Sequence, residues 1–395
     1  MTGWLVLGLG ILGTISSTVF LTLTLLGVRK FHRQAKADRR EMDMATEGSL
    51  PLVSILKPLH GLEPQLRENL ESFFRQDYPQ FEVLFAVDRA DDPALAVARL
   101  VCDAHPQIHS EILVTGIGPW PNRPVYSFAR MAEIARSSIL VTSDSDVLVD
   151  RHYLRAVVVP MLRPRIGMLT CVYRGLNAGG FWSRLDAVGM SVEMTAGVLV
   201  ANLLEGMKFG LGPTIVVRRD ALNSIGGYPV LGEYGPNDFV IGNRIAECGF
   251  DVALSSHVIS HVAPPMTLQQ MLKRHLRWAI GTRYSRPKGH LGSGLVYSVP
   301  YGIFGLMGGI LLHRAGLGFA LFAWSILNRV IEALVVGWGV TRDRDCLHNP
   351  WVYPIRDLFG FGVWVASYLG RAFQWRSGNY EFAEGGRMVA RGSRV

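Results

Sequence analysis

The sequence predicts an α/β protein with a mostly parallel sheet and covering helices, held in a membrane by helices near both ends of the chain. Three observations carry this prediction. Residues 50–290 alternate short runs of β-branched and apolar side chains with helical patterns, which is typical of β-α-β units. Residues 3–28 contain no charged side chain. Apolar segments return after residue 290 and continue to residue 370.

The composition supports a soluble domain joined to a lipid-embedded part. Hydrophobic side chains make up 49% of the 395 residues, and the mean hydropathy is +0.22. A charged fraction of 18% is too low for a disordered chain and too high for membrane spans alone. The four cysteines are far apart, without a C-x-x-C pair. This spacing argues against a disulfide framework or a zinc site and fits a reducing compartment.

The N-terminal segment is predicted to be an uncleaved anchor over residues 1–28. Its uncharged stretch exceeds the roughly 30 Å core of a bilayer at 1.5 Å per residue, and it lacks the basic leader of a signal peptide. Residues 29–40 hold six Lys or Arg against one Asp, and such a flank stays on the cytoplasmic side. We therefore expect a basic juxtamembrane linker over 29–49 and a cytoplasmic domain over 50–290.

The C-terminal membrane segments, over 291–370, leave the number of crossings open. Arg329 and Glu332 are three residues apart, so they share a helix face and can neutralise each other at depth. The basic tail, 371–395, favours two crossings with a third re-entrant or surface-lying segment. Lys and Arg cluster beside the apolar segments, which favours anionic lipid headgroups over nucleic acid as partners. We expect an integral membrane protein whose domain faces the cytoplasm, at the inner membrane in a bacterium.

The middle of the chain is predicted to form strands over 51–59, 81–88, 110–116 and 138–147, separated by helices over 63–76, 93–104 and 125–137. In parallel sheets, functional sites form at the carboxyl ends of the strands. Acidic residues occupy several of these ends in this sequence.

Two of these strand ends carry candidate ligands. Asp88 closes the second strand, with Asp91 and Asp92 beyond it, although a lone acid there is as often a helix cap. Asp144 and Asp146 follow the fourth strand at i and i+2, which suits Mg²⁺ or Mn²⁺ shared with substrate phosphates. A D-x-D pair alone is frequent by chance. Its place after a buried strand strengthens the interpretation, and no P-loop motif is present.

Two later features point to the same chemistry. Asp238 follows a Gly-Pro turn and opens a predicted helix, where an acid is also favoured by the helix dipole alone. Arg274, Arg277 and Trp278 share one helix face and offer forked donors for a diphosphate beside a flat apolar wall. A plain amphipathic helix near a membrane has the same pattern. His257 and His261 are expected to be structural.

The order and spacing of these residues resemble processive-type GT-A glycosyltransferases. The local sequences narrow the resemblance to the ceramide glucosyltransferase family, and it covers essentially the whole chain. The local sequences that carry this resemblance are Lys57 to Gly61, Asp91-Asp92-Pro93, Met207-Lys208-Phe209, Asp238-Phe239 and Arg274 to Trp278. The bacterial hopanoid-biosynthesis-associated glycosyltransferases are similar at Phe181 to Leu185 and Pro354 to Leu358.

The resemblance implies a GT-A fold and transfer of a hexose from a UDP-sugar to a lipid hydroxyl, most simply UDP-glucose to ceramide. It implies Asp238 as catalytic base and Asp146, with Asp144, at a divalent cation (Mn or Mg). The donor-binding residues that it implies are Pro58, Asp88, Asp92, Asn122, Arg123, Asp144, Arg274, Arg277 and Trp278. The family usually has a lysine two residues after the asparagine matching Asn122. Here Pro124 occupies that place, so Arg123 is the candidate substitute.

Other functions stay open at this point. The donor can be UDP-N-acetylglucosamine and the acceptor a phospholipid or another lipid. A nucleotide-sugar-binding membrane receptor is the non-enzyme alternative, although the joint presence of Asp144, Asp146 and Asp238 argues against it. A polysaccharide synthase is disfavoured because few spans remain to form a channel. The apolar stretch over 190–211 is a candidate wall for the acceptor, or a plain core helix.

Overall fold

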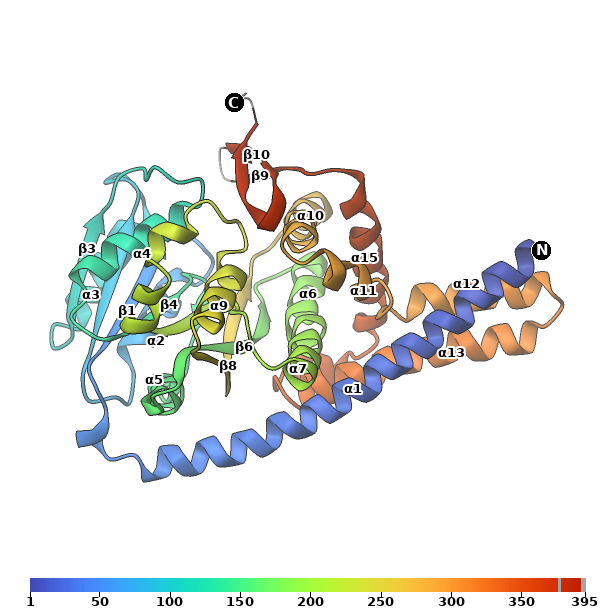
Figure 1. Ribbon diagram of the computed structural model, residues 1–395, viewed down its shortest axis with the longest axis horizontal. Helices are drawn as coiled ribbons and strands as arrows, with labels where there is room; N and C mark the ends of the chain where they lie inside the picture. Colours follow the sequence, from blue (N-terminus) through green and yellow to red (C-terminus); the bar gives the residue numbers. More distant parts are fainter. Residues whose placement is uncertain (376–377, 392–395) are drawn as a thin grey trace.

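The computed structural model describes residues 1–375 and 378–391. Its core is an eight-stranded sheet with the order β3-β2-β1-β4-β7-β6-β8-β5. Figure 1 shows this sheet at one end of the molecule and a projecting group of helices at the other, with the N-terminus at its tip. The strands are β1 (Val53–Leu59), β2 (Phe81–Val87), β3 (His109–Val114), β4 (Ile139–Ser143), β5 (Val147–Leu148), β6 (Ile166–Asn177), β7 (Thr214–Arg218) and β8 (Asp251–Ala263).

The pairing confirms the predicted mostly parallel sheet. Strands β3, β2, β1 and β4 are parallel neighbours, and β1, β2 and β4 are buried along nearly their full length, as in sheets covered on both faces. Strand β6 pairs in parallel with β8. Strand β7 is antiparallel to β4 and β6, and β5 is antiparallel to β8. The helices beside the sheet are α2 (Leu66–Phe74), α3 (Ala94–Ala104), α4 (Arg123–Ile134), α5 (Tyr153–Val158), α8 (Arg219–Ser224) and α9 (Asn237–Glu247).

The fourth predicted strand, over 138–147, divides into β4 and β5. The Val147 N–H donates to the Asp144 carbonyl at 3.4 Å and closes a turn between them. Strand β5 then pairs with β8, where Val147 lies opposite His261. The D-x-D carboxylates therefore sit on a turn at the carboxyl end of β4, and β8 brings a histidine to the same place.

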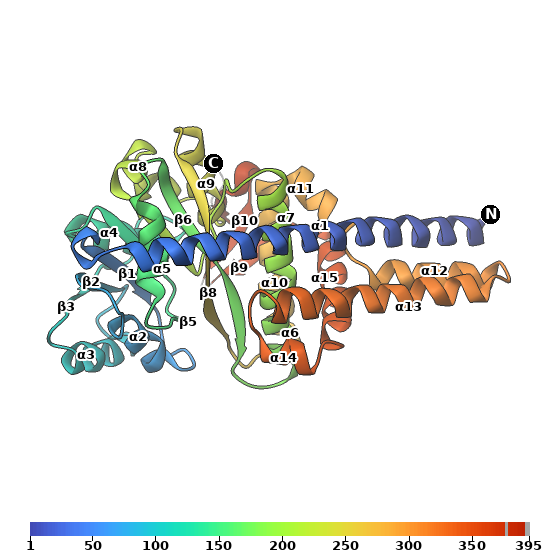
Figure 2. The same cartoon turned by 90° about the horizontal axis from the view of Figure 1, so that it is seen from below.

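Helix α1 (Thr2–Met44) continues from the predicted anchor through most of the predicted linker and ends at Met44. Its basic half lies along the domain, as Figure 2 shows. Asp38 accepts a hydrogen bond from the Ser256 hydroxyl at 2.7 Å, and Gln34 donates to the Leu254 carbonyl at 2.6 Å. These contacts attach the basic half of α1 to β8 of the domain.

Within the described residues, three helical stretches are long and apolar enough to cross a membrane: Thr2–Met44, Phe181–Leu204 and Ala315–Trp338. The second is mostly buried inside the protein; it comprises α6 (Phe181–Val188), a π-helical turn over Gly189–Met194 and α7 (Thr195–Leu204). Helices α12 (Val299–Leu311) and α13 (Ala315–Glu332) project beside α1 (Figure 1), whereas α15 (Val352–Ala366) packs against α6 and α10. The number of crossings stays a prediction.

The C-terminal region adds helices and a small sheet. Its elements are α10 (Leu268–Ser285), α11 (Pro287–Ser293), α14 (Arg344–His348), β9 (Ala372–Trp375), β10 (Gly378–Phe382) and β11 (Met388–Ala390). The three strands form an antiparallel sheet that packs on α10 through Ile280 and Phe382. The predicted pairing of Arg329 with Glu332 is confirmed at 2.7 Å, and Asp357 of α15 lies 3.4 Å from the same guanidinium.

Glycines bring α1 and α12 into backbone contact. A Cβ atom added to Gly10 would overlap the backbone of Gly305, and one added to Gly308 would overlap the backbone of Leu7. Small residues allow this close approach, which stabilises helix pairs where water provides no hydrophobic driving force.

Gly10→Leu is therefore expected to destabilise the protein, by about 1–3 kcal/mol or more, because the helices must separate to admit the side chain. The measurement is the thermal unfolding temperature of the full chain in detergent micelles. Gly8→Leu is the matched control, since a Cβ atom at Gly8 meets nothing within 4 Å. Equal unfolding temperatures for the two variants would contradict the observed packing.

Candidate active site

The site lies at the carboxyl ends of β1, β2 and β4. Lys57 of β1 is fully buried, and its Nζ donates to the Asp144 carbonyl at 2.8 Å. The same Nζ lies 3.6 Å from the centre of the Phe73 ring. Burial lowers the pKa of Lys57 to about 7, although Asp144 and Asp146 oppose this shift. Lys57 therefore fixes the backbone of the D-x-D turn from beneath.

Three carboxylates converge above this lysine. Glu63 accepts a hydrogen bond from the Ser145 hydroxyl at 2.6 Å. Burial, and then the charge of Asp146, raises the pKa of Glu63 to about 7. Burial and the neighbouring carboxylates Asp146 and Glu63 also raise the pKa of Asp144. Like charges held this close disfavour ionisation of the group, so a cation among them would be stabilising.

The residues around Asp146 fit such a cation. Its Oδ1 is buried and has no hydrogen-bond partner among the described residues, while its Oδ2 lies 3.4 Å from Nε2 of His261. In the described part of the chain, no group of three or more His, Cys, Asp or Glu side chains forms a complete metal site. Mg²⁺ and Mn²⁺ are commonly held by one or two carboxylates and completed by substrate phosphates and water. Asp146 and His261 therefore suit a cation that arrives with a phosphorylated ligand.

Asp238 lies in the first turn of α9, held by backbone donors. Its Oδ2 accepts from the Gly212 N–H at 3.0 Å, and its Oδ1 accepts from the Phe239 N–H at 2.9 Å. Its own carbonyl accepts from the Gly210 N–H at 2.9 Å. Burial raises the pKa of Asp238 in spite of these donors. The loop over 210–213, which supplies the Gly210 and Gly212 donors, also contacts the D-x-D turn, because the Asp144 N–H donates to the Pro213 carbonyl at 3.4 Å.

The remaining residues on the β1 to β4 side have separate places. Asp88 ends β2, with its Oδ2 3.9 Å from Nη1 of Arg123. Asp92 accepts from the Gly61 and Ala94 N–H groups, each at 2.9 Å, so its carboxylate braces the loop after β1 and caps α3. Asp91 is paired with Arg89 at the surface. Pro58 lies within β1, opposite Ala86 of β2.

Asn122 lies under the loop that leads to Asp238. It is 1% exposed, and its Nδ2 donates to the Tyr234 carbonyl at 2.7 Å and to Asn237 at 3.2 Å. The asparagine therefore positions this loop, while Arg123, the next residue, reaches toward Asp88.

Helix α10 carries the predicted basic face. The Arg274 guanidinium lies 4.7 Å from the centre of the Trp278 ring, with Nη1 3.6 Å from Asp186. Arg277 lies between Trp278 and Trp375, 5.9 and 5.4 Å from their ring centres. Burial, with a smaller effect of Arg274, lowers the pKa of Arg277 to about 10. In the described part of the chain, no carboxylate pairs with Arg277, so its donors are available to an anion.

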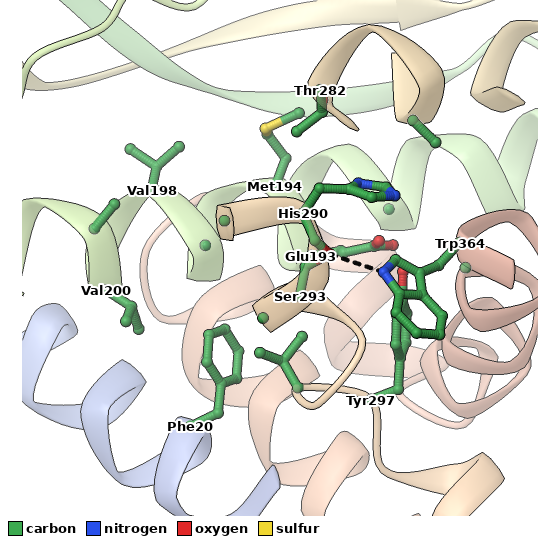
Figure 3. Close-up of a pocket in the computed structure, with 18 of the residues that line it drawn as sticks. Phe20, Glu193, Met194, Val198, Val200, Thr282, His290, Ser293, Tyr297 and Trp364 are labelled. Carbon is green, nitrogen blue, oxygen red and sulfur yellow. Dashed lines mark hydrogen bonds between the residues drawn. The ribbon is translucent and has the colours of Figure 1, made fainter. Parts of the chain in front are cut away.

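A large apolar cavity extends from the apolar half of α1 to Trp278 of the basic face on α10. It has a volume of about 730 Å³. One end is lined by Val19, Phe20 and Leu23 of the apolar half of α1, and the other by Tyr173 and Phe209. Phe209 precedes the loop that holds Asp238, and its ring stacks on Phe239 at 6.4 Å. Figure 3 shows side chains of α1, α7, α10, α11 and α15 directed into this space.

Sequence reasoning placed the acidic residues at the strand ends but missed Lys57, Glu63 and His261 as parts of the site. Lys57 is a charge inside an apolar strand, a rare placement that signals a specific partner. His261 lies on β8, and only the pairing of β5 with β8 reveals that it faces Asp146. The predicted acceptor wall, over 190–211, does line the cavity.

Comparisons with known proteins agree with this geometry. The family model described as glycosyl transferase family 21 matches residues 10–388. Ceramide glucosyltransferase 1 of Caenorhabditis elegans is 24% identical over 86% of this chain and 73% of its own length, and ceramide glucosyltransferase 3 of the same organism is 22% identical over 87% and 75%. The solved mannosyltransferase PcManGT from Pyrobaculum calidifontis, in complex with GDP-Man and Mn²⁺, has a TM-score of 0.51 at 16% identity, covering 91% of this chain and 98% of that chain. The predicted GT-A fold is confirmed.

Proposed function

The chain belongs to glycosyl transferase family 21, and we propose that it is a membrane-bound inverting enzyme that transfers a hexose from a UDP-sugar to a lipid hydroxyl. The observation that carries this proposal is the cavity of about 730 Å³, which is lined both by the apolar half of α1 and by Trp278 and Phe209. A lipid cannot leave the bilayer cheaply, at about 0.8 kcal/mol per exposed CH₂. A cavity with an apolar lining that begins at α1 and includes Trp278 can hold the acyl chains of the acceptor without that cost.

The donor is assigned to the cleft between the strand ends and α10. Asp146 and His261, with Asp144 close by, would hold a divalent cation, as the Mn²⁺ in the mannosyltransferase complex suggests. When bound, that cation offsets negative charge on the diphosphate. Arg277 and Arg274 donate to the phosphate oxygens, since guanidinium groups match phosphates geometrically. Asp88 is proposed to contact the uridine, with Arg123 beside it in place of the lysine usual in the family.

Asp238 is proposed as the general base. The acceptor hydroxyl approaches the anomeric carbon from the face opposite the diphosphate. The new bond forms between that oxygen and the anomeric carbon as the bond to the phosphate oxygen breaks, and its electron pair leaves with UDP. The hydroxyl proton passes to Asp238, which requires an approach of about 2.6–3.2 Å. The Gly212 and Phe239 N–H groups aim the carboxylate, and no covalent intermediate is needed.

Ceramide is the proposed acceptor, and glucose the proposed sugar, because the two Caenorhabditis elegans relatives are ceramide glucosyltransferases. We place the domain on the cytoplasmic face, since the basic half of α1 begins where its apolar half ends.

The test is a donor-by-acceptor assay of the full chain in nanodiscs with Mn²⁺. It crosses UDP-glucose, UDP-galactose and UDP-N-acetylglucosamine with ceramide, diacylglycerol and phosphatidylethanolamine. We expect UDP release from UDP-glucose to depend on ceramide. UDP release that depends on diacylglycerol or phosphatidylethanolamine would identify that lipid as the acceptor in place of ceramide. Donor binding without release in the presence of any of these lipids would support the receptor alternative instead.

A further inference from the structure

The small sheet near the end of the chain lies against the helix that carries the predicted basic face. We call β9, β10 and β11 the C-terminal sheet. Figure 1 shows it beside α10, and the two are in contact. Three side chains of the sheet, Phe373, Phe382 and Met388, form one apolar cluster with Ile280 of α10. The chemistry proposed above made no use of this sheet.

The C-terminal sheet is also hydrogen-bonded to the loop before the proposed base. The Gly235 N–H donates to the Gly386 carbonyl at 3.1 Å, and the Met388 N–H donates to the Glu233 carbonyl at 2.7 Å. A Cβ atom on Gly235 would overlap the Phe382 ring, so the absence of a side chain permits this close approach. The sheet therefore spans from the base loop to α10, which places it at the edge of the candidate active site.

Trp375 has a defined place in this sheet. It is the last residue of β9 and pairs with Gly378, the first residue of β10. Phe373, two residues earlier, stacks on Phe382 with the ring centres 4.2 Å apart. Residues two apart on a strand point to the same face, and the Trp375 side chain packs against the same apolar cluster as Phe373. The indole is therefore held on the face of the sheet that meets α10.

This indole meets Arg277 of α10. The guanidinium lies over the Trp375 ring, 5.4 Å from its centre, a distance at which the ring attracts a cation. Burial, and then the charge of Arg274, perturbs Arg277, with no carboxylate of the described residues opposing them. A guanidinium stacked on an aromatic face keeps the N–H groups at its edge available for a forked contact with phosphate oxygens.

We propose that Trp375 is a positioning residue of the donor site, whose indole holds the Arg277 guanidinium in the orientation that binds a nucleoside diphosphate. The inference rests on the assignment of Arg277 to the diphosphate in the proposed function, and it extends that site to the C-terminal sheet. An arginine side chain has many rotamers, so fixing it costs conformational entropy. An indole that restricts these rotamers before the ligand arrives lowers the cost of binding.

The test is the affinity of the full-length protein in detergent for UDP with Mn²⁺, measured by isothermal titration calorimetry. Trp375→Leu is expected to weaken UDP binding by about 3- to 20-fold, because a cation–π contact contributes on this scale. Trp375→Phe keeps an aromatic face and is expected to retain most of the affinity. Trp351→Leu is the matched control, since Trp351 is 54% exposed and directly precedes α15; its UDP affinity should equal that of the wild type.

Arg277→Gln separates positioning from a general effect on the fold. The variant has no charge to donate to the diphosphate, so it is expected to weaken UDP binding. Adding Trp375→Leu to Arg277→Gln should cause little further loss, because the two side chains act as one unit. The unfolding temperature of each variant is measured alongside. Trp375→Met, which fills more of the volume, replaces Trp375→Leu if the latter does not fold.

A loss of UDP affinity in Trp375→Leu supports the proposal if Trp375→Phe restores it and the Arg277→Gln background abolishes it. Unchanged affinity in Trp375→Leu, or equal losses with and without the Arg277 side chain, would overturn the proposal and leave Trp375 a packing residue of the C-terminal sheet. If Arg277→Gln binds UDP as tightly as the wild type, the assignment of Arg277 to the diphosphate is wrong and this inference is wrong with it. A lack of transfer in the nanodisc assay, with the UDP affinities as expected, counts against the proposed function alone.

Discussion

Asp238→Asn is expected to lower kcat by about 10²–10⁴-fold, the range that a positioned general base contributes. The carboxylate is held by two backbone N–H groups, and the amide of the variant cannot take up a proton. Binding of UDP and Mn²⁺ is expected to stay within a few fold of the wild type, because these ligands are assigned to other side chains. The measurement is the rate of UDP release with saturating donor and ceramide.

Asp251→Asn is the matched control, since Asp251 begins β8 at the surface, where its side chain forms an ion pair with Arg165 at 3.4 Å. Full turnover by Asp238→Asn would remove the proposed base. A loss of UDP binding equal to the loss of kcat would indicate a collapsed loop, because the amide satisfies only one of the two backbone donors.

The pH dependence gives a second measure of the same group. Burial raises the pKa of Asp238, and the base must be deprotonated to act. The value of kcat/KM is therefore expected to fall as the pH falls, with the acid limb above the pKa near 3.9 of an ordinary aspartate. Residual activity of Asp238→Asn should lack this limb. If the pH profile of the Asp238→Asn variant kept an acid limb at the same pH, that limb would belong to another titrating group.

Asp146→Asn is expected to lower turnover by about 10²-fold or more, because a bound cation contributes several kcal/mol of charge stabilisation. The buried, unpartnered Oδ1 of Asp146 is the strongest structural sign of a cation here. EDTA should cause the same loss in the wild type, and Mn²⁺ should restore it. In the variant, the Mn²⁺ concentration for half-maximal activity should rise sharply.

Asp103→Asn, at an exposed position on α3, provides the control for this change. His261→Gln is expected to raise the Mn²⁺ requirement less than Asp146→Asn, because neutral nitrogen ligands hold these hard cations less tightly than carboxylates. Activity that survives EDTA, with unchanged Mn²⁺ dependence in the Asp146 variant, would exclude the metal role.

Local patterns in the sequence were sufficient for most of the fold. The alternation of apolar runs and helical patterns located β1 to β4 and their intervening helices within a few residues, since burial on both faces leaves a continuous apolar signal. The acids after these strands, Asp88, Asp144 and Asp146, followed from position alone. The continuity of α1 past residue 28 could not be predicted from the sequence, because a basic helix and a basic linker have the same composition.

The α/β sheet and the order of the acidic residues followed from periodicity and spacing along the chain, and the family followed from the resemblance of local sequences. Only the tertiary structure decided which side chains meet. The pairing of β5 with β8 brings His261 to Asp146, and the packing of α10 against α6 and α15 brings His275 to Asp186 and Arg356. These contacts join residues about 80 or more positions apart, and no local pattern encodes the geometry of such a contact. The cavity lined by α1, α7, α10 and α15 is a product of the same long-range packing.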